Sequence, residues 1–287
     1  MASPSQHYFQ SQRLRLSYWS WGAVGDPGDE TSPPLIFVHG TRDHSRSWDR
    51  IANEFTADHT VVAYDLRGHG DSQWVMGGHY GITEHVVDLV ALIDVLGGRA
   101  TVVAHSLGGL VATLTAGLFP DHFEKLVAIE GAGERIHRRP LATPKALREW
   151  AVRTRGYDSN RPREYDSIEA GAARMREVNA QLSPGLAHHL ATHGMRQLDE
   201  KYVWKFDHWM GSSAPVEIRD EEARVIWGDV SCPVLLIMGA ESYERGQHLP
   251  RHVSRFPDAQ SVVVPDAGHW VHHDQPHAVV EAIKHFL

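Results

Sequence analysis

Short apolar runs recur along the chain and alternate with longer stretches in which apolar residues return at helical spacing. Residues 7–21 alternate apolar and polar side chains, a pattern typical of two half-buried strands. Continuous apolar runs, typical of strands covered on both faces, follow at 35–38, 60–64, 101–105, 125–129, 234–238 and 261–264. Amphipathic patterns predict helices at 47–55, 83–96, 107–119, 220–227, 247–256 and after Pro276. Since parallel neighbours need crossover connections, this order predicts an α/β fold with a mostly parallel, doubly wound sheet.

The alternation stops in the middle of the chain. Between Gly133 and Arg219 no apolar run suggests a strand, and prolines separate segments of helical character. The strand and helix pattern then returns with the helix predicted at 220–227. We therefore predict an α/β core made of residues 1–132 and 220–287, with a helical cap of residues 133–219 inserted after the sixth strand.

Composition narrows the possible partners and compartment. A chain of 287 residues with 42% hydrophobic and 22% charged residues is typical of a soluble globular protein with a full core. The formal charge of −8 argues against nucleic acid as a partner, because a phosphate-binding surface needs a basic excess. Cys232 is the only cysteine, and no signal-like or membrane-length apolar segment occurs. We expect a cytoplasmic protein that does not bind membranes.

The run at 101–105 leads directly into Ser106, which lies between two small residues, Ala104 and Gly108. This spacing matches the G-x-S-x-G nucleophile elbow with alanine in place of the first glycine. In that elbow a strand turns so sharply into a helix that the serine adopts a strained conformation and its neighbours must be small. Ser106 is therefore the candidate nucleophile.

Three further motifs lie beyond the ends of predicted strands, where ligand sites of such sheets are found. Together with the elbow, they make the chain resemble α/β-hydrolase fold proteins over its whole length, and in particular serine-hydrolase-like proteins with a helical cap. The resemblance implies an eight-stranded sheet and a nucleophile, acid and histidine in that order along the chain. The motifs are Val38-His39-Gly40, Asp65-Leu66-Arg67-Gly68-His69-Gly70-Asp71-Ser72 and Ala267-Gly268-His269.

A serine hydroxyl is a poor nucleophile at neutral pH, so a base must take its proton during attack. Among 21 histidines, His269 is the candidate base because it lies in a small-residue loop directly after the last predicted strand. The backbone amide of Leu107, next to Ser106, is a candidate oxyanion donor. The resemblance implies a second donor in the amide of Thr41, which follows the glycine motif after the third strand.

The triad acid is where the sequence departs from the pattern it resembles. Most such proteins place an aspartate after the seventh strand as G-x-x-D, but Ser242 occupies that position here. Glu130, directly after the sixth predicted strand, matches the alternative site of some capped relatives. Glu241 could serve instead if its loop turns the carboxylate toward His269. We favour Glu130 and keep Glu241 as the alternative.

The predicted cap should select the substrate. Trp204, Trp209 and Trp270 are candidate substrate contacts, and arginines at 135–139 follow Glu130. An aromatic, mildly basic cap favours a small-molecule substrate with an apolar or aromatic acyl group, with a carboxylate as an option. The histidines form neither an H-E-x-x-H motif nor a Cys/His grid, so we expect no metal and no other cofactor.

Three functions fit these features. The first is a serine hydrolase that cleaves a carboxylic ester or a related acyl bond through an acyl-enzyme. The second is a cofactor-free dioxygenase of the α/β-hydrolase fold, which is implied because members of that branch also keep a serine elbow, a histidine and an acid after the sixth strand. The third is a non-enzymatic small-molecule receptor on the same fold. The motifs favour the hydrolase.

Overall fold

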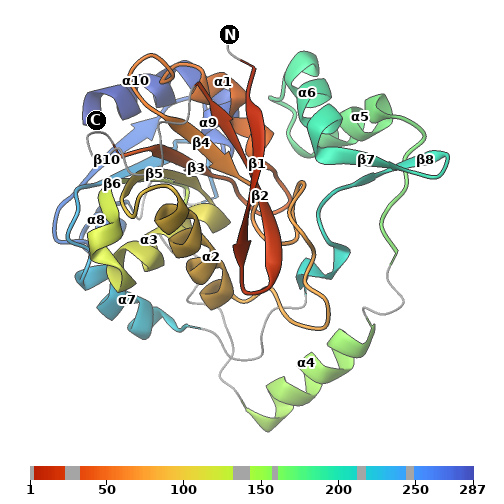
Figure 1. The fold of residues 1–287 in the computed structure, drawn as a ribbon, viewed down its shortest axis with the longest axis horizontal. Helices are drawn as coiled ribbons and strands as arrows, with labels where there is room; N and C mark the ends of the chain where they lie inside the picture. The colour runs from red at the N-terminus through yellow and green to blue at the C-terminus, as the bar shows by residue number, and fades with distance from the viewer. Residues whose placement is uncertain (1–2, 23–32, 132–142, 157–160, 212–217, 244–248) are drawn as a thin grey trace.

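The computed structural model describes residues 3–22, 33–131, 143–156, 161–211, 218–243 and 249–287. Its centre is an eight-stranded sheet in the order β1-β2-β4-β3-β5-β6-β9-β10 (Figure 1). The first two neighbouring pairs in this order are antiparallel and the other five are parallel, so the mostly parallel sheet predicted from the sequence is confirmed. The strands are β1 (Ser5–Ser11), β2 (Leu14–Trp21), β3 (Leu35–Val38), β4 (Val61–Tyr64), β5 (Ala100–His105), β6 (Phe123–Ile129), β9 (Val234–Gly239) and β10 (Ala259–Val264).

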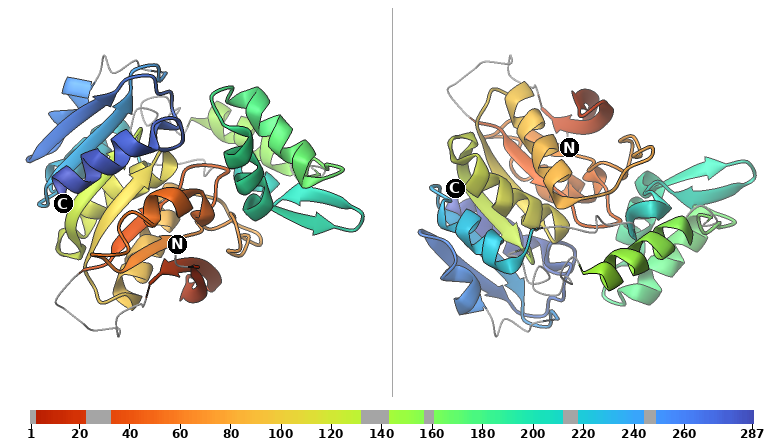
Figure 2. Two further views of the ribbon diagram at one scale, coloured as in Figure 1. Left: turned by 90° about the horizontal axis from the view of Figure 1, so that it is seen from above. Right: turned by 90° about the horizontal axis from the view of Figure 1, so that it is seen from below.

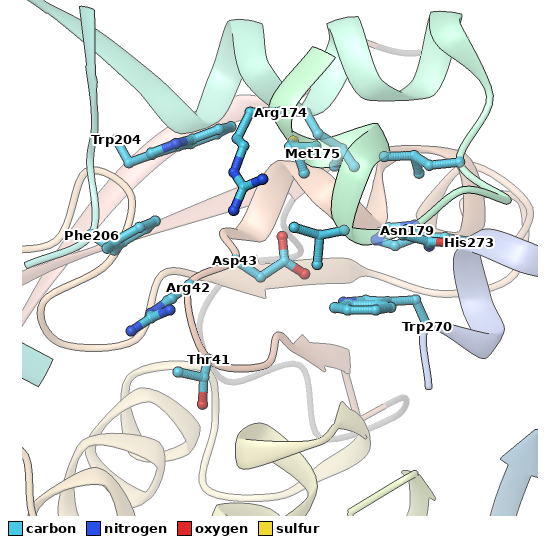
Figure 3. Close-up of a pocket in the computed structure, with 13 residues that line it drawn as sticks. Thr41, Arg42, Asp43, Arg174, Met175, Asn179, Trp204, Phe206, Trp270 and His273 are labelled. Atoms are coloured by element: carbon cyan, nitrogen blue, oxygen red, sulfur yellow. The ribbon is translucent and has the colours of Figure 1, made fainter. Parts of the chain in front are cut away.

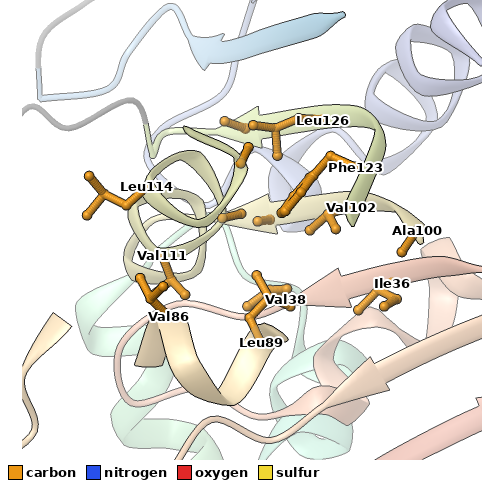
Figure 4. Close-up of a cluster of buried hydrophobic side chains, with 14 of the residues drawn as sticks. Ile36, Val38, Val86, Leu89, Ala100, Val102, Val111, Leu114, Phe123 and Leu126 are labelled. Carbon is orange, nitrogen blue, oxygen red and sulfur yellow. The ribbon is translucent and has the colours of Figure 1, made fainter. Parts of the chain in front are cut away.

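Helices cover both faces of the sheet, which explains why its central strands are apolar throughout. In β3, Ile36 and Val38 pack in one hydrophobic cluster, while Leu35 and Phe37 pack in another on the opposite face. Figure 4 shows the first cluster between the strands, α2 and α3. The core helices are η1 (Ser45–Trp48), α1 (Asp49–Ala52), α2 (Ile82–Val95), α3 (Leu107–Leu118), η2 (Pro120–His122), α7 (Asp220–Gly228), α8 (Leu249–Val253), α9 (Val271–Asp274) and α10 (Pro276–Phe286).

The segment between β6 and α7 lies to one side of the sheet (Figures 1 and 2). Its buried residues form a separate small core. Tyr165, Leu186, Leu190 and Met195 are among the buried residues of that core. The predicted cap boundary at 132/133 lies outside the described residues, whereas α7 begins at Asp220 as expected. The segment contains α4 (Pro144–Gly156), α5 (Ile168–Val178), α6 (Pro184–Gly194), β7 (Met195–Leu198), β8 (Lys201–Trp204) and η5 (His208–Gly211).

The antiparallel pair β7 and β8 corrects the expectation that this segment contains no strand. The two strands meet at a tight turn in which Asp199 has a φ of 53°. Met195 and Val203 are buried, but most of the other side chains of the hairpin are polar. Strands of four residues are too short to show a periodic hydrophobic signal, so the sequence pattern missed them. Across the described ranges, no helix combines the length and apolar character needed to cross a bilayer.

Candidate active site

The candidate nucleophile lies at the sharp turn between β5 and α3. Ser106 has a φ of 51° and a ψ of −115°, a conformation that costs free energy for any residue with a side chain. The glycines that follow allow α3 to approach the sheet closely. A Cβ on Gly108 would lie 2.5 Å from the carbonyl oxygen of His39, and one on Gly109 would lie 2.7 Å from the Cα of Gly131. The small residues predicted around the elbow are therefore required by backbone packing.

His269 lies between Ser106 and Glu130, although these residues come from three different loops. Its Nε2 is 3.0 Å from the Oγ of Ser106, and its Nδ1 is 3.2 Å from the Oε2 of Glu130. The side chain of His269 is 16% exposed and that of Glu130 is 4% exposed. The carboxylate accepts a hydrogen bond from Nδ1–H, which leaves the Nε2 lone pair directed at the serine hydroxyl. The serine, histidine and acid expected from the sequence thus form one hydrogen-bonded chain.

Two donors hold the carboxylate of Glu130. Its Oε1 accepts a hydrogen bond of 2.8 Å from the backbone N–H of Gly239, and its Oε2 accepts one of 2.5 Å from the hydroxyl of Ser242. Ser242 is the residue that occupies the usual acid position. In this chain Ser242 therefore does not supply the acid but donates to the carboxylate of Glu130, which follows the neighbouring strand β6.

Glu241, the alternative acid, has a different environment. Its side chain is exposed, and its Oε2 lies 3.4 Å from the Nε2 of Gln181 in the segment between β6 and α7. Its backbone N–H donates to the carbonyl of Ala267 at 2.9 Å. The structure therefore brings Glu130, and not Glu241, into hydrogen-bond distance of His269.

Both candidate oxyanion donors lie beside Ser106. Leu107 is the first residue of α3, and the loop carrying Thr41 passes so close that a Cβ on Gly40 would lie 3.1 Å from the Cβ of Ser106. Thr41 and Leu107 also line a small cavity of about 140 Å³, together with His69, Tyr80, Ile82, His85 and Met210. A developing oxyanion at the serine would therefore face two neighbouring backbone segments.

Two buried histidines fix the shape of the Thr41 loop. Nδ1 of His39 is 2.7 Å from the carbonyl of Gly40, so it carries the proton, and Nε2 accepts from the amide of Leu66 at 3.0 Å. His69 follows the same logic, because Nδ1 donates to the carbonyl of Arg67 at 3.0 Å and Nε2 accepts from the amide of Arg42 at 3.1 Å. Each ring needs its neutral form for both bonds.

We expect the protein to lose stability steeply in mild acid. Burial lowers the pKa of His39 and of His44 from 6.5 to about 3, so the unfolded chain binds protons below pH 6.5 that the folded chain rejects. Each of these histidines lowers the free energy of unfolding by about 2 kcal/mol as the pH falls from about 7 to about 5. Burial also lowers the pKa of His69, His85, His105 and His272.

Asp43 acts in the opposite direction, because burial raises its pKa to about 7 and the folded state then gains a proton first. One carboxyl offsets about one histidine, so the net loss of stability remains large. Urea unfolding between about pH 7 and about pH 5 checks this expectation, and His44→Gln should reduce the slope of stability against pH. A midpoint that does not move with pH would contradict it.

A larger pocket of about 280 Å³ opens between the core and the segment from β6 to α7 (Figure 3). Of the predicted substrate contacts, Trp204 and Trp270 line this pocket, whereas Trp209 lies in η5 and does not. Sequence reasoning missed the polar lining residues Arg174 in α5 and Asn179 directly after it, because nothing in the sequence marks them as different from neighbouring polar residues. The arginines expected at 135–139 lie outside the described residues.

Comparison with known proteins connects this geometry to a family. Residues 35–282 match the Alpha/beta hydrolase family. The esterase YbfF of Escherichia coli is 28% identical over 268 residues, which cover 88% of this chain and 92% of that protein. The esterase Rv0045c of Mycobacterium tuberculosis is 29% identical over 289 residues, which cover 95% of this chain and 86% of that protein.

Solved structures show the same fold. The hypothetical protein PA1622 from Pseudomonas aeruginosa superposes with a TM-score of 0.86 over 98% of both chains, at 23% identity. The thioesterase domain from the curacin biosynthetic pathway gives a TM-score of 0.82 over 98% of this chain and 99% of that one, at 20% identity. The family match spans most of the chain, and the eight-stranded sheet agrees with it. The chain belongs to the alpha/beta hydrolase family.

Proposed function

We propose that the protein is a serine hydrolase that cleaves a carboxylic ester or a related acyl bond through a covalent acyl-enzyme. The observation that carries this proposal is the position of His269, with one ring nitrogen 3.0 Å from Ser106 Oγ and the other 3.2 Å from Glu130 Oε2. The similarity to curated esterases supports the same class of reaction. In this proposal Ser106 is the nucleophile, His269 the general base and Glu130 the acid.

The reaction proceeds in two halves. Nε2 of His269 takes the hydroxyl proton as Ser106 Oγ attacks the acyl carbon, and Glu130 stabilises the imidazolium that forms. The backbone N–H groups of Thr41 and Leu107 donate to the oxyanion of the tetrahedral intermediate. His269 then returns the proton to the leaving oxygen as the bond to the acyl carbon breaks. Water repeats the sequence on the acyl-enzyme and releases the acid and the free serine.

The pocket favours a small acyl compound with an apolar or aromatic body. Apolar side chains form much of its wall, including Met175, Leu182, Leu190, Trp204, Phe206 and Trp270. Arg42 adds positive charge at the same pocket, so the proposal includes acyl groups that carry a carboxylate. The formal charge of −8 and the buried Cys232 agree with a small-molecule enzyme of a reducing cytoplasm.

We further propose that residues 133–219 act as the cap. Three contacts join this segment to the core. Nε2 of His44 lies 3.0 Å from the carbonyl of Leu190, and the ammonium of Lys205 lies 2.8 Å from the carboxylate of Asp71. The backbone N–H of Asp207 donates to the carbonyl of Gly68 at 2.7 Å. These contacts hold α6 and the residues that follow β8 against the core loops after β3 and β4.

A serine-directed fluorophosphonate, combined with an aryl-ester assay, tests the proposal. We expect one phosphonate adduct per chain by intact mass, a modified peptide that contains Ser106, and hydrolysis of aryl esters with acyl chains from acetyl to octanoyl. Tryptic peptide mapping locates the adduct. The absence of both labelling and hydrolysis would contradict the proposal and favour the receptor. Oxygen-dependent turnover of an N-heteroaromatic substrate without ester hydrolysis would favour the dioxygenase.

A further inference from the structure

A second group of polar side chains lies on the wall of the larger pocket, apart from the serine. Asp43 comes from the loop after β3, whereas His272 and His273 belong to α9, which begins shortly after His269. One ligand atom from each of these three side chains lies within 4.8 Å of the other two. Asp43 and His273 line the pocket, as Figure 3 shows. The three side chains therefore surround a point that can be reached from the pocket.

His272 is buried in a way that needs an explanation. It is 2% exposed, and neither ring nitrogen has a hydrogen-bond partner within the part of the chain that the structure describes. Its ring stacks on Trp48 with centroids 4.5 Å apart, and the ring centroid of His273 is 4.0 Å away. A buried polar atom without a partner costs about 1–3 kcal/mol. A ligand at the point shared with Asp43 would supply a partner to one of the two ring nitrogens.

The chemistry of the donors identifies the class of ligand. Two imidazoles and one carboxylate suit divalent transition metals, whereas calcium and magnesium prefer oxygen donors. The carboxylate is also held in place, because Ser47 Oγ donates to one oxygen of Asp43 at 3.0 Å and the amide of His44 donates to the other at 2.9 Å. Each oxygen keeps a lone pair, and such supporting bonds orient a metal ligand.

We propose that Asp43, His272 and His273 bind a divalent transition metal ion of the Zn²⁺ type. Three protein ligands leave a fourth position open, and here it faces the pocket. Arg174, which lines the same pocket, pairs with Glu177 at 2.5 Å, so its charge is compensated locally. An ion at this point occupies space that the proposed function gives to substrate. A bound ion therefore inhibits ester hydrolysis. This inhibition rests on the proposed function, whereas the binding of the ion does not rest on it.

A second cluster offers an internal comparison. Asp49, His189 and His193 also lie within 4.8 Å of one another. There the carboxylate is already bound by Arg46, whose guanidinium nitrogens lie 2.6 to 3.1 Å from the Asp49 oxygens. A cation in that position competes with a metal ion, and no such pair involves Asp43 among the described residues. The first cluster is therefore the better site.

Titration of the purified protein with Co²⁺, followed by visible absorption, tests the proposal without any enzyme assay. We expect one bound Co²⁺ per chain, displaced by Zn²⁺. His273→Gln and Asp43→Asn should weaken the binding by about tenfold or more, because each removes a ligand. His193→Gln, the matched control in the second cluster, should bind like the parent chain. Circular dichroism shows whether each variant is folded.

Several results would overturn this assignment. They are the absence of stoichiometric Co²⁺ binding, binding that His273→Gln and Asp43→Asn leave intact, and binding lost only in His193→Gln. If an aryl ester is hydrolysed, the Zn²⁺ concentration that halves the rate, measured with substrate well below KM, should match the dissociation constant and rise by about tenfold in His273→Gln. If no ester is hydrolysed, the proposed function fails, but the Co²⁺ titration still decides the metal site.

Discussion

Ser106→Ala should abolish covalent labelling by the fluorophosphonate and lower kcat for an aryl ester by about 10⁶-fold, the scale of loss when a triad serine is removed. The methyl group cannot form the acyl-enzyme, and His269 then has no hydroxyl at 3.0 Å to deprotonate. Alanine also accepts the sharp turn no worse than serine does, since both carry a Cβ at the same φ of 51°. The fold should therefore survive the substitution.

The comparison variant for this experiment is Ser254→Ala. That hydroxyl is exposed and donates to the carbonyl of Arg251 at 3.0 Å, with no role in the proposed chemistry. It should keep parental labelling and kcat. Ester turnover retained by Ser106→Ala, measured with protein free of parental enzyme, would remove the serine-hydrolase proposal.

Glu130→Gln should lower kcat by about 10³–10⁴-fold, the loss expected when an amide replaces the triad acid and favours the wrong tautomer of the histidine. The new amide can still accept from Gly239, but its NH₂ group would face Nδ1 of His269 and the hydroxyl of Ser242. An N–H donor at that place moves the ring proton to Nε2, where it blocks proton transfer from Ser106. Steady-state kinetics and the rate of phosphonate labelling measure the effect.

Glu241→Gln is the matched control, because the same isosteric change is made on an exposed side chain whose described side-chain hydrogen bond goes to Gln181. We expect it to change kcat by less than about threefold, as is usual for surface substitutions away from the chemistry. If Glu241→Gln lost more activity than Glu130→Gln, the acid would belong to the loop after β9. Small and equal losses would mean that neither carboxylate orients His269.

The sequence was most informative where a side chain must satisfy two constraints at once. The run Leu35–Val38 predicts its strand because a strand covered on both faces has no polar side. The small residues around Ser106 predict the elbow because the helix that follows lies in contact with the backbone of two neighbouring loops. Such local requirements determine the types of consecutive residues, so the fold class and two of the proposed catalytic residues could be identified from the amino-acid sequence alone.

Contacts between distant residues could not be predicted in this way. Glu130 and Ser242 are 112 positions apart, and only the pairing of β6 with β9 brings them together. The cluster of Asp43 and His272 depends on the contact between the loop after β3 and α9, and it matches no spacing motif. The hairpin β7–β8 was missed for another reason, because its strands have only four residues each and pack on the small core of their own segment.

The hydrogen bond between Ser242 and Glu130 has an implication for how such a triad can change over time. Because β6 and β9 are adjacent, the hydroxyl of Ser242 lies 2.5 Å from the Glu130 oxygen that faces Nδ1 of His269, so an acid can pass from one strand to the other while serine and histidine stay in place. A chain with acids at both ends would hold two carboxylates around one ring, and their repulsion would keep one of them protonated and able to donate. A protonated acid at position 242 would do what the serine hydroxyl does here. On the proposed assignment, a chain with acids at both positions would therefore keep a complete triad while the acid changes strand.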